Sequence, residues 1–276
     1  MNKVAVRALS GIIYVAVIVG CILLGIDAVT TLALVLGALG LIEFYKITDG
    51  LSSDNVPPML IDYASIAVII AGLRHESALL LWPILLLFRF TAELYYKNPS
   101  PINALSRSVF AQIYLGIPLG LMQRLEVFNG GGTWGHGYAL LAIFIMIWLN
   151  DTGAFCVGSM MGKHKLFERI SPKKSWEGFY GGLMFNLIAA VCFCLWCPGA
   201  FAIHANLWVW LGLAVVVSLF STWGDLLESL IKRTYNVKDS GHWIPGHGGI
   251  LDRIDSLLFV SPASFFYLLF CAATLG

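Results

Sequence analysis

The stretch LWVWLGLAVVVSLFSTWGDLLESL, residues 207–230, decides the fold class of this chain. Its hydrophobicity is continuous over most of its length, whereas a strand of a membrane β-barrel alternates polar and apolar residues. A helix of about 20 apolar residues crosses the hydrocarbon core of a bilayer, which is roughly 30 Å thick. The stretch therefore predicts a membrane-spanning helix.

Similar runs recur along the whole chain, and the composition agrees with them. Of the 276 residues, 58% are hydrophobic and only 12% are charged, which lies outside the range of soluble globular domains. Nine candidate spans cover residues 9–26, 28–45, 58–73, 77–96, 108–122, 138–158, 179–197, 207–230 and 254–275. We expect an all-α integral membrane protein, a polytopic bundle of about nine transmembrane helices.

The chain is expected to have two parts. Residues 1–137 form an N-terminal transmembrane helical bundle, and residues 138–276 form a C-terminal transmembrane catalytic region whose cytoplasmic loops carry the motifs. The first apolar run stays apolar after Cys21 and shows no small-residue cleavage site, so we interpret it as a retained helix and not as a signal peptide.

Basic residues indicate the orientation of the spans, because Lys and Arg concentrate in short cytoplasmic loops. With the N-terminus inside, all but three of the 17 Lys and Arg residues fall in inner loops. The exceptions are Arg74 and Arg124 in outer loops and Arg89 within a span, four residues before Glu93, with which it is expected to form an ion pair. No pattern of nucleic-acid binding is present.

Carboxylates flank the loop SLIKRTYNVKDSGHWIPGHGGILDRIDS, residues 229–256. Asp225 and Glu228 lie three residues apart before it, and Asp252 and Asp255 lie three residues apart at its end, so each pair shares one helix face. Hard oxygen ligands of this kind suit Mg²⁺. We predict a metal site at Asp225, Asp252 and Asp255, with a second metal ion left open; the alternative for the last two is a helix start that favours Asp because of the helix dipole.

The same loop predicts phosphate binding. Gly248 and Gly249 allow backbone amides to approach an anion closely, and His247 either donates to a phosphate or caps the turn. Basic side chains that can neutralise phosphate oxygens surround these residues. They are Lys232, Arg233, Lys238 and Arg253.

The preceding cytoplasmic loop repeats this chemistry. Ser171, Lys173 and Lys174 stand directly before a predicted helix, where free amides and the helix dipole favour an anion. Part of this positive charge also follows from the topology rule alone. We predict substrate binding by these three residues.

These motifs resemble those of the phosphatidate cytidylyltransferase (CDP-diacylglycerol synthase) family. The resemblance covers roughly residues 138–262, and the family's signature is present in full. Its residues here are Ser229, Lys232, Arg233, Lys238, Asp239, Pro245, His247, Gly248, Gly249, Asp252, Arg253 and Asp255.

The resemblance implies transfer of CMP from CTP to phosphatidic acid, with Mg²⁺, at a site facing the cytoplasm of a bacterial inner (cytoplasmic) membrane. It also implies a homodimer surrounded by membrane lipids. Asp225, Asp252, Asp255, Lys232 and Arg233 are the catalytic candidates. A CTP-dependent polyprenol or phytol kinase is the alternative enzyme, and an ion-coupled transporter is the alternative from another class; the complete signature weighs against the first, and the dense polar loop against the second.

Overall fold

A computed structural model describes residues 3–49, 56–96, 98–128, 138–197, 201, 206–241, 243 and 248–275. The first half of the chain contains seven described helices and two short helical turns. They are α1 (Lys3–Leu24), α2 (Ile26–Asp49), α3 (Val56–Arg74), α4 (Glu76–Leu79), α5 (Leu81–Glu93), α6 (Pro101–Ala111), the π-helical turn η2 (Gln112–Gly116), α7 (Ile117–Arg124) and the 3₁₀ turn η3 (Leu125–Phe128). The remaining elements are α8 (Tyr138–Met161), β1 (Lys165–Phe167), β2 (Ser171–Ser175), α9 (Trp176–Trp196), α10 (Leu207–Thr234) and α11 (Leu251–Leu275).

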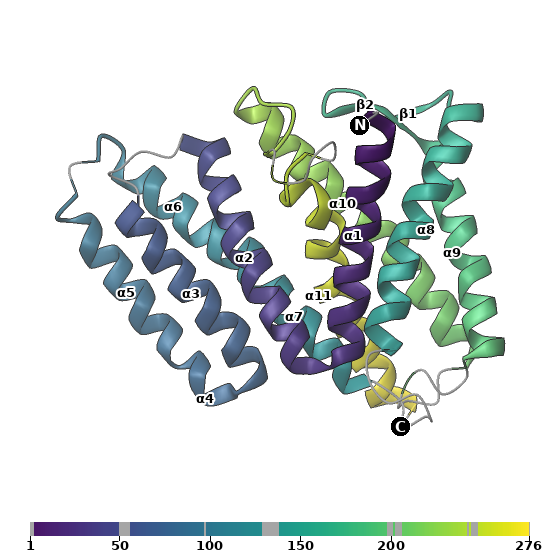
Figure 1. Cartoon of the computed structure of the whole chain (residues 1–276), viewed down its shortest axis with the longest axis horizontal. Helices are drawn as coiled ribbons and strands as arrows, with labels where there is room; N and C mark the ends of the chain where they lie inside the picture. The colour runs from purple at the N-terminus through teal and green to yellow at the C-terminus, as the bar shows by residue number, and fades with distance from the viewer. Residues whose placement is uncertain are drawn as a thin grey trace. The chain divides into compact units, whose positions relative to one another are not determined.

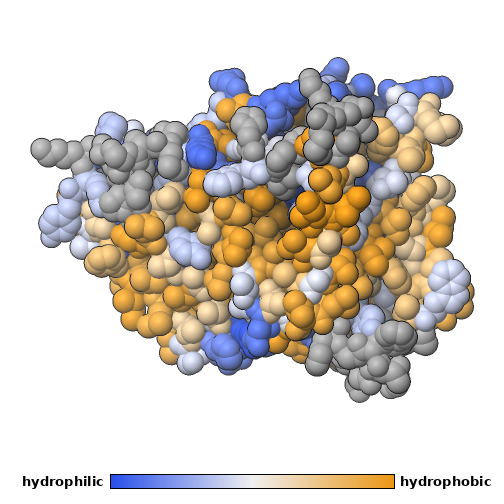
Figure 2. Space-filling view, in the orientation of Figure 1, coloured by the Kyte–Doolittle hydropathy of each residue, from blue (hydrophilic) through white to orange (hydrophobic). Residues whose placement is uncertain are grey.

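The all-α membrane fold is confirmed. Within the described residues, seven helical segments are long and apolar enough to cross a membrane. They are Val6–Leu24, Ile26–Thr48, Pro101–Phe128, Tyr138–Met161, Trp176–Trp196, Leu207–Thr234 and Leu251–Thr274. Hydrophobic residues cover most of the visible helix surface (Figure 2). This protein is therefore an integral membrane protein, as the composition predicted.

Three predicted spans differ from the structure. Residues 58–73 lie in helix α3, which is not among the seven segments that are long and apolar enough to cross a membrane. The continuous helix expected over residues 77–96 is wrong, because the chain breaks at Leu80 between α4 and α5. Pro83, in the first turn of α5, has no amide to continue the helical hydrogen bonds backwards. The span expected over residues 108–122 is longer than predicted and runs through α6, η2, α7 and η3.

The chain folds as two compact units that are interleaved in sequence. Unit 1 consists of Met1–Arg124 and Tyr235–Arg253, and unit 2 of Leu125–Thr234 and Ile254–Gly276. The sequence predicted two consecutive parts that meet at Tyr138. In the structure, the segment Tyr235–Arg253 packs with the N-terminal helices and belongs to unit 1.

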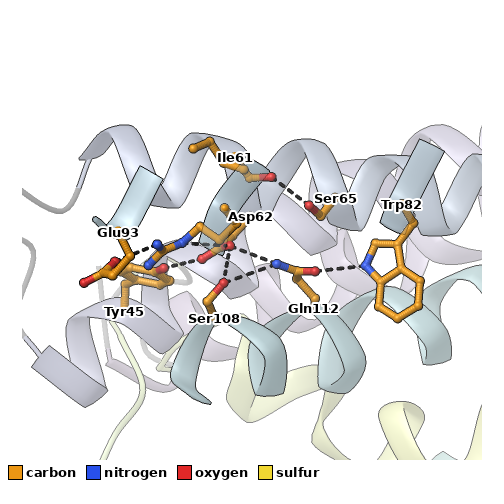
Figure 3. A network of polar contacts seen from close by, with 9 residues as sticks. Tyr45, Ile61, Asp62, Ser65, Trp82, Glu93, Ser108 and Gln112 are labelled. Carbon is orange, nitrogen blue, oxygen red and sulfur yellow. Dashed lines mark hydrogen bonds and ion pairs between the residues drawn. The ribbon is translucent and has the colours of Figure 1, made fainter. Parts of the chain in front are cut away.

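A buried polar network joins four helices of unit 1, in which α3 lies between α2 and α5 (Figure 1). The Asp62 carboxylate on α3 accepts hydrogen bonds from Tyr45, Ser108 and Gln112, and lies 3.6 Å from Nε of Arg89 (Figure 3). Arg89 also pairs with Glu93 at 2.6 Å, which confirms the predicted ion pair. All these residues are at most 5% exposed, so the network fixes the packing of the helices around it.

In unit 2, α8 and α9 lie side by side in close contact (Figure 1). A Cβ atom added at Gly153 would lie 2.8 Å from the carbonyl oxygen of Gly181, and one added at Gly181 would lie 2.5 Å from Cβ of Val157. Small residues let membrane helices approach this closely, and dispersion contacts then hold them together. The pair is a rigid support for the hairpin between the two helices.

That hairpin is the described β-structure, and the sequence did not predict it. Strands β1 and β2 pair antiparallel, with Lys165 opposite Ser175. Glu177 on α9 accepts hydrogen bonds from the backbone amides of Lys163 and His164, and Ser175 caps α9 by accepting from the amide of Gly178 at 3.2 Å. The hairpin is thereby fixed to the first turn of α9.

Candidate active site

Three carboxylates converge in unit 2. One oxygen from each of Asp225, Glu228 and Asp255 lies within 4.8 Å of the others. Asp225 and Glu228 share a face of α10, and Asp255 comes from α11. We call these three residues the carboxylate cluster. The predicted association of Asp225 with Asp255 is thus present, with Glu228 as the third member.

The close approach of α11 to α10 depends on Gly224. A Cβ atom at this position would lie 2.4 Å from the carbonyl oxygen of Asp255. Beside it, the Ser256 hydroxyl donates to the carbonyl oxygen of Ser221 at 3.2 Å, and the Ser256 amide donates to Asp255 Oδ1 at 2.6 Å. Asp255 is therefore held in place by backbone contacts between the two helices.

Lys174 bridges the hairpin and the carboxylate cluster. Its Nζ lies 2.6 Å from Asp225 Oδ2, and the two side chains are 25% and 38% exposed. The Ser229 hydroxyl donates to the other oxygen of Asp225 at 3.3 Å. Lys174, predicted as a substrate-binding residue, therefore lies directly beside the cluster.

Lys232 forms a second ion pair on α10. Its Nζ lies 2.5 Å from Glu228 Oε2, one helical turn earlier, and the side chains are 11% and 3% exposed. Asp151 on α8 adds a further carboxylate that interacts electrostatically with Asp255. The cluster thus has three carboxyl groups and two lysine partners, so one more acidic group than basic group gathers here.

The donor set fits a magnesium ion. It consists of carboxylate oxygens from three residues within a short distance of one another, and hard oxygen ligands of this type are those that Mg²⁺ prefers. Asp225 is partly exposed, which leaves room for the waters or substrate phosphates that Mg²⁺ usually keeps. The residues that would hold the ion are Asp225, Glu228 and Asp255.

Asp252, the third predicted metal ligand, belongs to unit 1. Its Oδ2 accepts hydrogen bonds from the backbone amides of Gly249 at 2.9 Å and Ser240 at 3.1 Å. Gly248 has φ +85, and a Cβ atom there would lie 2.7 Å from Asp252 Oδ2. Gly248 thus has a backbone conformation and a close approach to Asp252 that both favour a residue without a side chain.

Glu43 on α2 is a residue whose place the sequence reasoning missed. We assigned it no role from the sequence, and in the structure it is fully buried. Its carboxylate accepts hydrogen bonds from the amides of Ile250 and Leu251 and from the Ser240 hydroxyl. The sequence did contain a signal for this role, a single acidic residue within an apolar run. A carboxylate in such a place is costly in a membrane unless it has partners.

The other predicted site residues occupy varied positions. Lys173, Arg233, Lys238 and Arg253 are exposed, and Ser171 is half-buried at the start of β2. The carbonyl oxygen of Arg253 accepts a hydrogen bond from Tyr14 at 3.0 Å. Pro245 and His247 lie outside the described residues. The roles of these residues stay predictions.

Comparison with known proteins points to one family. The model of the cytidylyltransferase family matches residues 5–271. A Staphylococcus aureus (strain COL) protein named phosphatidate cytidylyltransferase is 50% identical over 128 residues, which cover 46% of this chain and 47% of that relative. Proteins of the same name from Staphylococcus epidermidis (strain ATCC 12228 / FDA PCI 1200) and Staphylococcus haemolyticus (strain JCSC1435) are 47% and 48% identical, with the same shares covered.

The chain thus spans about half the length of the curated relatives it matches. The family model, in contrast, covers nearly all of it, including both units and the carboxylate cluster. The chain therefore belongs to the cytidylyltransferase family.

Proposed function

We propose that this protein is a phosphatidate cytidylyltransferase, which transfers CMP from CTP to phosphatidic acid with the help of Mg²⁺. The observation that carries the proposal is the carboxylate cluster of Asp225, Glu228 and Asp255, flanked by Lys174 and Lys232. Membership of the cytidylyltransferase family and the name of the relatives support it.

In this reaction, a phosphate oxygen of phosphatidic acid attacks the α-phosphorus of CTP. A new P–O bond forms, and the bond from the α-phosphorus to the oxygen that bridges to the β-phosphate breaks. Pyrophosphate leaves with that electron pair, and CDP-diacylglycerol remains. Because the attacking phosphate is already ionised at neutral pH, the protein needs no strong general base, and its main task is to control negative charge.

The residues of the site divide this task between them. A bound Mg²⁺ supplies Lewis-acid polarisation of phosphate oxygens. Asp225, Glu228 and Asp255 would hold it, and Asp252 stays a further predicted ligand. The ion pairs of Lys174 and Lys232 orient two of these carboxylates and place positive charge beside them.

Exposed basic side chains serve the substrate phosphates. Lys173, Arg233 and Lys238 are the candidates, because their exposed ammonium and guanidinium groups can donate hydrogen bonds to phosphate oxygens. We place the site at the cytoplasmic face of a bacterial inner (cytoplasmic) membrane, on the basis of the charge distribution of the loops. There CTP arrives from water and phosphatidic acid arrives along the bilayer.

The test is formation of CDP-diacylglycerol and pyrophosphate by the purified protein in detergent. We expect product only when CTP, phosphatidic acid and Mg²⁺ are all present. Asp225→Asn should lower kcat by at least about 100-fold, which is a typical cost of losing one group that stabilises charge in the transition state. Asp27→Asn is the matched control, because Asp27 is 87% exposed and belongs to unit 1.

Two results would contradict the proposal. Release of CDP together with a phosphorylated alcohol would indicate the lipid kinase. Absence of nucleotide turnover by a well-folded preparation would favour the transporter. The expected homodimer is checked separately, by the mass of the purified particle.

A further inference from the structure

Glu43 connects the N-terminal helices to the second part of unit 1, Tyr235–Arg253, which we call the motif segment. It lies on α2, and its partners Ile250 and Leu251 follow it by 207 and 208 residues. Its Oε1 accepts from the Ile250 amide at 2.9 Å, and its Oε2 accepts from the Leu251 amide at 2.8 Å. Because Leu251 is the first residue of α11, Glu43 supplies the N-terminal cap that a neighbouring side chain normally provides.

Ser240 extends this contact to Asp252. The Ser240 hydroxyl donates to Glu43 Oε2 at 3.0 Å and accepts from the Asp252 amide at 3.3 Å. The Ser240 amide in turn donates to the Asp252 carboxylate at 3.1 Å. A continuous chain of hydrogen bonds thus runs from Glu43 through Ser240 to a predicted metal ligand.

The glycines of this segment are shaped around the Glu43 carboxylate. A Cβ atom at Gly249 would lie 2.0 Å from the Ser240 hydroxyl and 2.5 Å from Glu43 Oε2. A Cβ atom at Gly241 would lie 2.3 Å from Glu43 Oε1. The carboxylate therefore fills the space that side chains at these positions would need, which gives a physical reason for glycine at both.

Because Glu43 is fully buried, its carboxylate must do more than fill space between the helices. A carboxylate that is 0% exposed is stable only when charge-assisted hydrogen bonds replace its hydration, and the partners Ser240, Ile250 and Leu251 all belong to the motif segment. From these contacts we infer that Glu43 is a positioning residue for the reaction. It holds the motif segment and the first turn of α11 in place, so that Asp252 keeps a single orientation. This inference rests on the proposed function.

The test combines exchange and kinetics with Glu43→Gln. The amide group of Gln keeps the volume but turns one acceptor into a donor that faces an N–H group. Without metal or substrate, the Ile250 and Leu251 amides should exchange with deuterium about tenfold faster or more, because each loses a bond to a charged group. With substrates, kcat should fall by about 100-fold, the cost of a small misplacement of a reacting group, with KM for CTP less affected. Glu43→Asp should recover part of both.

Glu93→Gln is the matched control, since it removes a buried carboxylate from the same unit that contacts Arg89 and not the motif segment. It should leave the exchange of Ile250 and Leu251 and the kcat of folded protein unchanged. Ser240→Ala removes only the hydroxyl and provides a milder variant should Glu43→Gln not fold.

Two outcomes overturn the inference. One is amide exchange in Glu43→Gln and Ser240→Ala equal to that of Glu93→Gln. The other is faster exchange with unchanged kcat, which would make Glu43 purely structural. A wild-type protein that forms no CDP-diacylglycerol would instead reject the proposed function, while the exchange comparison would still show whether Glu43 holds the segment.

Discussion

Nζ of Lys174 lies 2.6 Å from Oδ2 of Asp225, so a residue of the hairpin before α9 neutralises a carboxylate on α10. The pair joins two sequence motifs that are about 50 residues apart. In the proposed reaction it gives Asp225 a fixed direction and leaves its other oxygen to Ser229 and to a metal ion.

Lys174→Met should therefore lower kcat by at least about 100-fold, a typical effect of losing one charged group that stabilises the transition state. Methionine keeps much of the length of lysine, so the hairpin should stay folded. Lys165→Met, on the exposed face of the same hairpin, is the control and should retain activity. Equal activity of the two variants would remove Lys174 from the site. Steady-state assays of CDP-diacylglycerol formation make the comparison.

Mg²⁺ should raise the thermal stability of the protein without any substrate. A ligand that binds only the folded state stabilises it by about 2.7 kcal/mol at a concentration of 100 times its Kd. Tm should rise with Mg²⁺ in the wild type and fall back after EDTA, whereas Asp225→Asn and Asp255→Asn should respond weakly. A rise of the same size in all three proteins would mean that the ion binds elsewhere.

Glu228→Gln should destabilise the fold by about 3 kcal/mol, because it removes the carboxylate that neutralises the largely buried Lys232. The double variant Glu228→Gln with Lys232→Met should recover much of this stability, since no buried charge then lacks its counter-charge. Its activity should stay low, because a cluster carboxylate is missing. Chemical unfolding in detergent and product assays separate the two effects. Full activity in the double variant would show that the pair is only structural.

Gly153→Ala should destabilise unit 2 by about 1–3 kcal/mol, the usual cost of overpacking. The added methyl group would lie 2.8 Å from a backbone oxygen of Gly181, which cannot move aside as a side chain can. Gly20→Ala on α1 is the matched control, because a Cβ atom there meets nothing within 4 Å. The control should be neutral or slightly stabilising, as alanine favours helices over glycine. Thermal unfolding of both variants is the measurement.

Asp62→Leu should cost the protein several kcal/mol of stability, because Arg89 and the donors Tyr45 and Gln112 lose their shared acceptor in a buried place. The protein that still folds should keep its kcat, since the network belongs to unit 1 and shares no residue with the carboxylate cluster. A loss of kcat without a loss of stability would instead assign Asp62 a part in the reaction.

The sequence predicted the fold class well, because continuous apolar runs are a local signal that a bilayer makes strict. It also predicted that Asp225 and Asp255 lie close together, because each belongs to a polar motif beside an apolar helix. The break at Leu80 had a local cause in Pro83, but hydrophobicity alone does not show it.

Glu43 shows what sequence reasoning cannot reach. Its apolar neighbours identify a helix, but its three hydrogen-bond partners lie 197 to 208 residues away. No periodicity connects positions so far apart, and only packing of the segment Tyr235–Arg253 onto the N-terminal helices brings them together. The ion pair of Lys174 with Asp225 likewise depends on tertiary packing, which no local sequence pattern shows.

The interleaving of the two units also sets an order of events during synthesis. Ile250 and Leu251 leave the ribosome more than 200 residues after Glu43. At about 5–20 residues per second, that delay is roughly 10 to 40 s. Until then the Glu43 carboxylate has none of these partners, so the buried surroundings of this part of α2 are complete only after the motif segment has been synthesised. Maturation of the N-terminal helices is thereby coupled to the arrival of the motif segment.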